Sequence, residues 1–104
     1  MSLQKYQQRI DAELQLYEKP YWDPLSILAR MTEEVGEVAR IVNHTFGDKP
    51  KKVSEEHEPL EDELADVIYA AICLANSQKL DLDAAMERVI AKLSTRDKDR
   101  FKKK

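Results

Sequence analysis

A chain of 104 residues is long enough for one domain, placed at residues 1–104, and short enough that a second copy would help to bury apolar surface. With 42% hydrophobic residues, 36% charged residues and two glycines, the composition excludes a disordered protein and favours long helices. The net charge of −3 gives no signal for binding a nucleic acid polymer, and the single cysteine excludes an internal disulfide.

No segment of the chain is typical of a membrane protein or of a secreted one. The first residues are polar and contain no apolar signal region. The longest uncharged run, residues 67–78, is too short to span a bilayer. We therefore expect a cytoplasmic protein without a membrane partner.

The first predicted helix covers residues 2–18, with Ser2 as its N-cap and apolar residues at intervals of three or four. It ends before a segment, residues 19–24, that contains two prolines. Trp22 lies in this segment. The sequence leaves two roles open for it: closing one end of the core, or stacking on a flat ligand such as a nucleobase.

The second predicted helix begins at Asp23-Pro24, an N-cap followed by proline at the first helical position, and runs to about His44. Apolar residues cover more than half of its circumference, so we expect it to pack on two sides. Glu34 falls among these apolar residues and should be at least partly enclosed. Glu33 and Glu37 lie beyond them on the helical wheel.

The third predicted helix begins at Pro59 and runs to about Gln78. A charged loop, residues 48–58, precedes it and is either a flexible lid or a plain connector. Glu63 and Asp66 stand just before an uncharged run that predicts burial on nearly all sides.

The fourth predicted helix begins after Asp81 and runs to about Leu93, with an apolar face expected to line the core. A basic segment follows it. Lys92, Arg96 and Arg100 are spaced by four residues, which would place them on one stripe suited to a phosphate chain. Residues 102–104 are expected to form a solvated tail. Together these elements predict an all-α, four-helix bundle-like fold.

The acidic residues of the second and third helices form pairs. Residues three or four apart share a face of a helix, so Glu34 pairs with Glu37 and Glu63 pairs with Asp66. If the two helices pack side by side, four or five carboxylates converge, and a cation would relieve their repulsion. Oxygen ligands favour Mg²⁺, Mn²⁺ or Ca²⁺, and Mg²⁺ commonly works with substrate phosphates. The pattern therefore indicates metal-assisted attack of water on a phosphoanhydride.

Other helical phosphate and metal enzymes fit the sequence poorly. Neither of the two histidines, His44 and His57, stands three residues after a glutamate, as di-iron carboxylate bundles require. The sequence also has no adjacent His-Asp pair and no glycine-rich phosphate loop. Phosphate would then be held by metal and by basic side chains.

The combination Glu33-Glu34-x-x-Glu37, a spacer of 25 residues, and Glu63-x-x-Asp66 resembles the signature of the MazG-type nucleoside triphosphate pyrophosphohydrolases, within the all-α NTP pyrophosphatase superfamily. The similarity extends from the helix start after Trp22 to Arg96. It implies cleavage of an NTP or dNTP between the α- and β-phosphates to the monophosphate and pyrophosphate, in nucleotide-pool housekeeping. It also implies Mg²⁺, with Mn²⁺ possible, and an obligate homodimer or dimer of dimers whose active site lies near the subunit interface.

The resemblance also implies roles for individual residues. Glu33 would position water or support the metal ligands, and some relatives carry an aromatic residue where this chain has Ala70, which leaves the preferred base and sugar open. The other implied roles are metal binding by Glu34, Glu37, Glu63 and Asp66, phosphate binding by Lys92 and Arg96, and base contacts by Trp22 and His44.

Two other functions compete with this interpretation. A non-catalytic helical dimerisation module, or a nucleotide-binding regulator, would use the same helices but release no pyrophosphate. A calcium-responsive site fits less well, because the carboxylates lie on rigid helices rather than on an adaptable loop. The sequence does not determine the number of metal ions, the choice between dimer and tetramer, or whether the basic residues act within one subunit.

Overall fold

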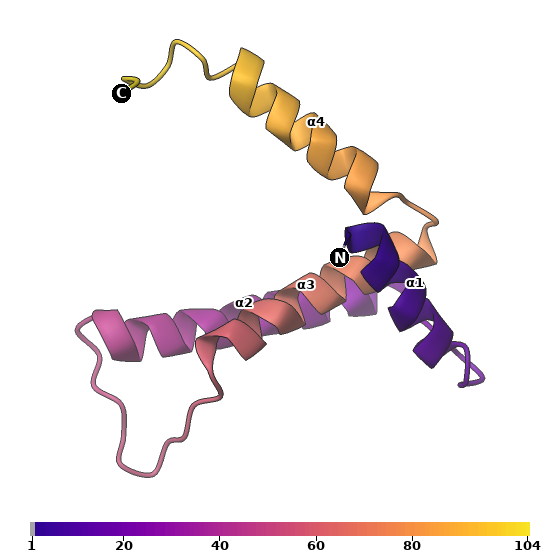
Figure 1. Ribbon diagram of the computed structural model, residues 1–104. Coiled ribbons are helices and arrows are strands. Elements are labelled where there is room, and N and C mark those ends of the chain that lie inside the picture. Colours follow the sequence, from indigo (N-terminus) through magenta and orange to yellow (C-terminus); the bar gives the residue numbers. More distant parts are fainter. Residues whose placement is uncertain (1) are drawn as a thin grey trace.

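A computed structural model describes residues 2–104 of the chain, which form four helices and, over those residues, no strand (Figure 1). The helices are α1 (Leu3–Leu14), α2 (Pro24–Phe46), α3 (Leu60–Ser77) and α4 (Leu82–Thr95). The all-α class is confirmed. The first helix ends at Leu14 rather than near residue 18, because the chain reverses direction to bring the Tyr21 hydroxyl within 2.5 Å of Asp11 Oδ1.

The centre of the fold is an antiparallel hairpin of α2 and α3, which lie side by side (Figure 1). Pro24 opens α2 directly after Asp23, and the backbone of Gly47 closes it by donating to Asn43 O at 2.9 Å. The core between the helices is small and is formed by the buried residues Ile27, Ile41, Ala70, Ile72, Cys73 and Ala75. Because two of these are alanines, the helices can approach closely, which brings facing side chains into contact.

A buried amide, Gln7, joins α1 to the end of α3 and the start of α4. Its Nε2 donates to Asn76 Oδ1 at 2.9 Å and to Leu80 O at 2.8 Å, and its Oε1 accepts from Leu82 N at 3.1 Å. Asn76 completes the junction by donating to Gln7 O and to the Tyr21 hydroxyl, both at 3.0 Å. This network fixes α1 across the end of the α2–α3 hairpin.

Replacing Gln7 with alanine should therefore lower the free energy of unfolding by about 2–4 kcal/mol, since several buried polar groups would lose partners. Urea denaturation followed by circular dichroism measures the effect. Gln8→Ala is the matched control, because Gln8 is exposed on the same helix. Equal midpoints for the two variants would show that the junction does not stabilise the fold.

The isolated chain is expanded for its length. Its radius of gyration is 17.3 Å, whereas a compact domain of this size has a radius of about 13 Å. Figure 1 shows α4 extending away from the α2–α3 hairpin. The prediction that the apolar face of α4 lines the core of its own chain is wrong: α4, described in full, has no buried residue. The periodicity identified an apolar stripe correctly but could not identify which surface covers it.

Large apolar side chains are exposed on three of the helices, and the free chain leaves them in contact with solvent. They are Leu25, Leu28, Val35, Val42 and Phe46 on α2, Leu64 and Ile68 on α3, and Met86, Val89, Ile90 and Leu93 on α4. Over residues 2–104, no helix has the length and apolar character needed to cross a membrane. Exposed apolar surface of this extent is typical of a protein–protein interface.

Candidate active site

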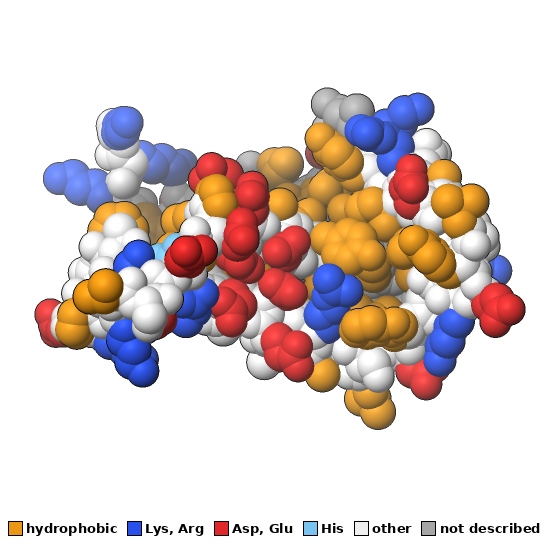
Figure 2. Space-filling view, turned by 90° about the horizontal axis from the view of Figure 1, so that it is seen from below, with side chains coloured by type: hydrophobic (Ala, Val, Ile, Leu, Met, Phe, Trp, Pro, Cys, Tyr) orange, Lys and Arg blue, Asp and Glu red, His pale blue; other side chains and the backbone are white. Residues whose placement is uncertain are grey.

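Three carboxylates meet where the first turns of α3 face the middle of α2. One oxygen atom from each of Glu34, Glu63 and Asp66 lies within 4.8 Å of the others. Glu34 comes from α2, and the other two come from α3, where a spacing of three residues places them on one face. Figure 2 shows acidic side chains gathered in the middle of one face of the molecule, beside a hydrophobic patch. The predicted convergence of the two acidic pairs is thus present for these three residues.

Glu63 is the most buried of these carboxylates, with 7% of its surface exposed. Burial raises the pKa of its carboxyl, and the charges of Asp66, Glu34 and Glu37 raise that pKa further. A side-chain hydrogen bond with Glu34 acts in the same direction. These causes disfavour the ionised form of Glu63, and a bound cation would favour it.

Glu37 lies beside this group of three and is bound to an arginine. Arg40 Nη2 and Nε lie 3.0 and 3.1 Å from Glu37 Oε2. The charge of Glu37 still acts on Glu63, so this carboxylate belongs to the same acidic region. Glu33 is exposed and is not one of the three clustered residues.

The donor set of this cluster fits a hard divalent cation. All of the converging atoms are carboxylate oxygens, which suit Mg²⁺ or Mn²⁺ better than zinc or copper. Glu34, Glu63 and Asp66 could hold such an ion directly, and Glu37 stands next to them.

Arg30 lines a cavity of about 330 Å³, together with Trp22 and Tyr69. Its guanidinium lies 5.4 Å from the centre of the Trp22 ring and 5.3 Å from the centre of the Tyr69 ring. Arg30 Nε also lies 3.8 Å from Glu34 Oε1. The cavity has the size and the aromatic walls that suit a planar heterocycle.

The sequence analysis gave Arg30 and Tyr69 no role in this site. Tyr69 lies one position before Ala70 on α3. In the structure the centre of its ring lies as close to the Arg30 guanidinium as the centre of the Trp22 ring does. The available signal was the spacing of four residues between Arg30 and Glu34, which places an arginine one turn before the buried carboxylate.

His44 lies far from this cavity. The α2 helix has 23 residues and is therefore about 34 Å long, with Trp22 just before its first residue and His44 in its last turn. The His44 side chain is 2% exposed and contacts His57 from the loop between α2 and α3. Within one chain, a single base cannot contact both Trp22 and His44.

The basic residues of the last helix also lie away from the carboxylates. Lys92 is exposed on α4, and Arg96 Nε lies 3.1 Å from Asp97 Oδ1. Figure 1 shows α4 directed away from the hairpin that carries the acidic residues. One chain therefore presents the predicted metal ligands and the predicted phosphate-binding residues on separate surfaces.

Comparisons with known proteins point to one family. The profile of the MazG nucleotide pyrophosphohydrolase domain matches residues 23–101. The uncharacterized protein YpjD of Bacillus subtilis (strain 168) is 43% identical over 103 residues, covering 99% of this chain and 93% of YpjD.

Two solved structures are also similar to the chain. A crystal structure of Bacillus subtilis YpjD matches with a TM-score of 0.81 and 40% identity, covering 91% of this chain and 97% of that one. The crystal structure of the Bacillus-conserved MazG protein, a nucleotide pyrophosphohydrolase, matches with a TM-score of 0.78 and 39% identity, covering 95% and 96%.

Proposed function

The chain belongs to the MazG nucleotide pyrophosphohydrolase family, and from this we propose that it hydrolyses an NTP or dNTP between the α- and β-phosphates. The products would be the nucleoside monophosphate and pyrophosphate. The observation that carries the proposal is that Glu34 and Asp66 lie close to the buried carboxylate of Glu63, whose pKa their charges raise. Its substrates would be free nucleotides, which fits a cytoplasmic location, and residues 1–104 would act as one catalytic domain.

Each acidic residue has a role in this proposal. Glu34, Glu63 and Asp66 would bind Mg²⁺, or Mn²⁺ in its place, and Glu37 would join them by exchanging part of its contact with Arg40. When bound, such an ion supplies an activated water and neutralises charge on the phosphates. Glu33, exposed on the same helix, would orient the water from outside the cluster.

The cavity that Trp22, Arg30 and Tyr69 line would hold the base. Trp22 and Tyr69 supply aromatic surfaces, and Arg30 supplies a cation between this cavity and Glu34. A nucleotide placed with its base here would direct its phosphates toward the acidic cluster. Since His44 lies at the far end of α2, we assign the base contact to the Trp22 end.

A second copy of the chain would complete the site. The apolar faces of α2, α3 and α4 need a cover, and the radius of gyration of one chain exceeds that of a compact domain. A partner packed on these faces could bring its own α4, with Lys92 and Arg96, to the carboxylates. The active enzyme would then be a homodimer, or a dimer of dimers.

The proposed reaction is tested by screening pyrophosphate release over canonical and modified NTPs and dNTPs, with Mg²⁺ or with a chelator. We expect release of pyrophosphate and monophosphate in equal amounts, and only when the divalent metal is present. Release of inorganic phosphate instead would place the cleavage at the β–γ bond. The absence of any release over the whole panel would contradict the proposed activity.

Replacing Trp22 with alanine should raise KM about tenfold with a small change in kcat, because base stacking contributes to binding in both ground and transition states. Steady-state kinetics on the best substrate of the screen measure both constants. Trp22→Phe is the matched control, since it keeps an aromatic face and should keep most of the affinity. An unchanged KM in the alanine variant would remove Trp22, which is 53% exposed, from the base site.

A further inference from the structure

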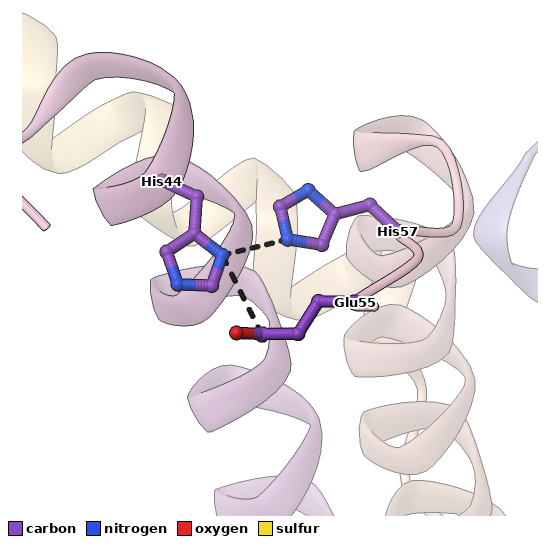
Figure 3. Close-up of side chains that lie close together, drawn as sticks. All are labelled: His44, Glu55 and His57. Atoms are coloured by element: carbon purple, nitrogen blue, oxygen red, sulfur yellow. Dashed lines mark hydrogen bonds and ion pairs between the residues drawn. The ribbon is translucent and has the colours of Figure 1, made fainter. Parts of the chain in front are cut away.

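The chain has two histidines, thirteen residues apart in sequence, and the structure brings them into contact (Figure 3). His44 lies in the last turn of α2, and His57 lies in the loop of residues 47–59. His44 Nδ1 is 2.8 Å from His57 Nε2. The Glu55 carboxylate approaches the same point, with Oε2 3.9 Å from His44 Nδ1.

Two imidazole nitrogens at this separation share a hydrogen bond, in which one ring donates its N–H to the lone pair of the other. A metal ion can replace the proton, because both nitrogens and the carboxylate point to one place. We propose that His44 Nδ1, His57 Nε2 and the Glu55 carboxylate form a second metal site, selective for Zn²⁺ and similar transition-metal ions.

The three groups fit tetrahedral coordination after a small adjustment. Two nitrogens that each bind zinc at about 2.0–2.1 Å lie about 3.3 Å apart, so the pair has to open by about half an ångström. His57 and Glu55 come from a loop, which can supply this movement. Water would take the fourth position.

The protonation state of His57 suits a metal ligand. Burial lowers the pKa of its imidazole, as do the charges of Arg40, His44 and Lys51, while Glu55 raises it. The ring is therefore neutral near pH 7 and has a lone pair to offer.

Two features of the site limit its affinity. Once His44 Nδ1 binds a metal, the remaining proton moves to Nε2, which is buried and has no hydrogen-bond partner among residues 2–104. Arg40 Nη1 also lies 3.2 Å from Glu55 Oε2 and adds a positive charge nearby. An incomplete second shell weakens metal binding by about 10- to 100-fold, so we expect this site to bind Zn²⁺ more weakly than a site with a complete second shell by about that factor.

This site differs in chemistry from the carboxylate cluster on the same helices. Imidazole nitrogens prefer zinc, cobalt or nickel, whereas the cluster offers only oxygen atoms, which prefer magnesium or manganese. The two sites are joined through Arg40, which contacts both Glu37 and Glu55. A metal held here would fix the 47–59 loop against the end of α2, one turn beyond the arginine that holds Glu37.

The test is a titration of Co²⁺ into the full chain, prepared without a histidine tag and in excess Mg²⁺. We expect visible d–d absorption that saturates at one Co²⁺ per chain and disappears when Zn²⁺ is added. His57→Ala should weaken binding at least about tenfold, and Glu55→Gln should weaken it by a smaller factor. Glu56→Gln is the matched control, because it removes the same charge from the next, exposed residue of the loop.

Other results would overturn the proposal. The site is absent if Co²⁺ shows no saturable absorption, or if His57→Ala binds it as tightly as the original chain does. Loss of the signal in Glu63→Gln but not in His57→Ala would place the ion among the carboxylates instead. Circular dichroism of each variant shows whether the helices are retained, so that loss of binding is not confused with unfolding.

Discussion

Replacing Glu63 with glutamine should lower kcat for pyrophosphate release by about a thousandfold or more, and should also stabilise the metal-free chain at neutral pH. The loss of activity follows because an amide removes one oxygen ligand and one negative charge from the group that stabilises the transition state. The gain in stability follows because the same charge is buried among Asp66, Glu34 and Glu37. A residue that served only the fold would not produce these opposite effects.

The stability effect should depend on pH in a defined direction. Burial and neighbouring carboxylates raise the pKa of Glu63 in the folded chain above its ordinary value of 4.5. Between the ordinary pKa and the raised pKa of the folded chain, Glu63 holds its proton more tightly in the folded state than in the unfolded state. The free energy of unfolding therefore falls as pH rises through this range. Glutamine has no proton to lose. The advantage of Glu63→Gln should thus be largest above the folded-state pKa of Glu63 and should disappear below about pH 4.

Urea denaturation of the metal-free proteins at several pH values measures the change in stability. Mg²⁺-dependent release of pyrophosphate measures the loss of activity. Glu61→Gln is the matched control, because Glu61 is exposed in the same first turn of α3 and lies outside the cluster of three. It should leave activity and stability almost unchanged. Normal turnover by Glu63→Gln would contradict its assignment as a metal ligand. Destabilisation of the Glu63→Gln variant at pH 7 would contradict the repulsion between Glu63 and the neighbouring carboxylates.

The elements that the sequence predicted well are those set by local signals. Pro24 and Pro59 fix the starts of α2 and α3. The contact of Glu34 with Glu63 and Asp66 was also predictable, because both acidic groups face one way and the loop allows antiparallel packing. Local capping and helical periodicity together position most of the acidic cluster.

The contacts that the sequence did not predict join residues distant along the chain. Periodicity identified the apolar stripe of α4 but could not show that the helix turns away from the hairpin. The proximity of Arg30 to both Tyr69 and Trp22 could not be read from a helical wheel, because a wheel describes one helix and not the angle between two. The pairing of His44 with His57 depends on the path of an irregular loop, for which no periodic signal exists.

The direction of α4 leads to a second prediction, which distinguishes a shared active site from a self-contained one. Two inactive variants, Glu63→Gln and the double variant Lys92→Ala/Arg96→Ala, should restore activity when their subunits are mixed. Each variant alone lacks one half of every site. If α4 of one subunit serves the carboxylates of the other, each mixed dimer contains one site with both halves intact.

The expected recovery can be calculated from random pairing. At equal amounts, half of the dimers are mixed and one of their two sites is complete, so activity should reach about a quarter of the original. Subunits are exchanged by co-expression or by refolding from urea, and pyrophosphate release is measured against each variant alone. The same experiment with Lys103→Ala/Lys104→Ala in place of the α4 variant is a control for charge, because these exposed lysines lie beyond α4.

A self-contained site gives a different result for a clear physical reason. If Lys92 and Arg96 acted on the carboxylates of their own chain, each site in a mixed dimer would still lack one half, and mixing would restore nothing. That outcome would require α4 to fold back onto its own hairpin, which would bury Met86, Val89 and Ile90 against the same chain. Full activity of the double variant alone would instead remove both basic residues from the site. Recovery to about a quarter of the original activity is therefore the result expected of a dimer. In that dimer the partner would cover the exposed apolar faces, and α4 of one subunit would bring its basic residues to the carboxylates of the other.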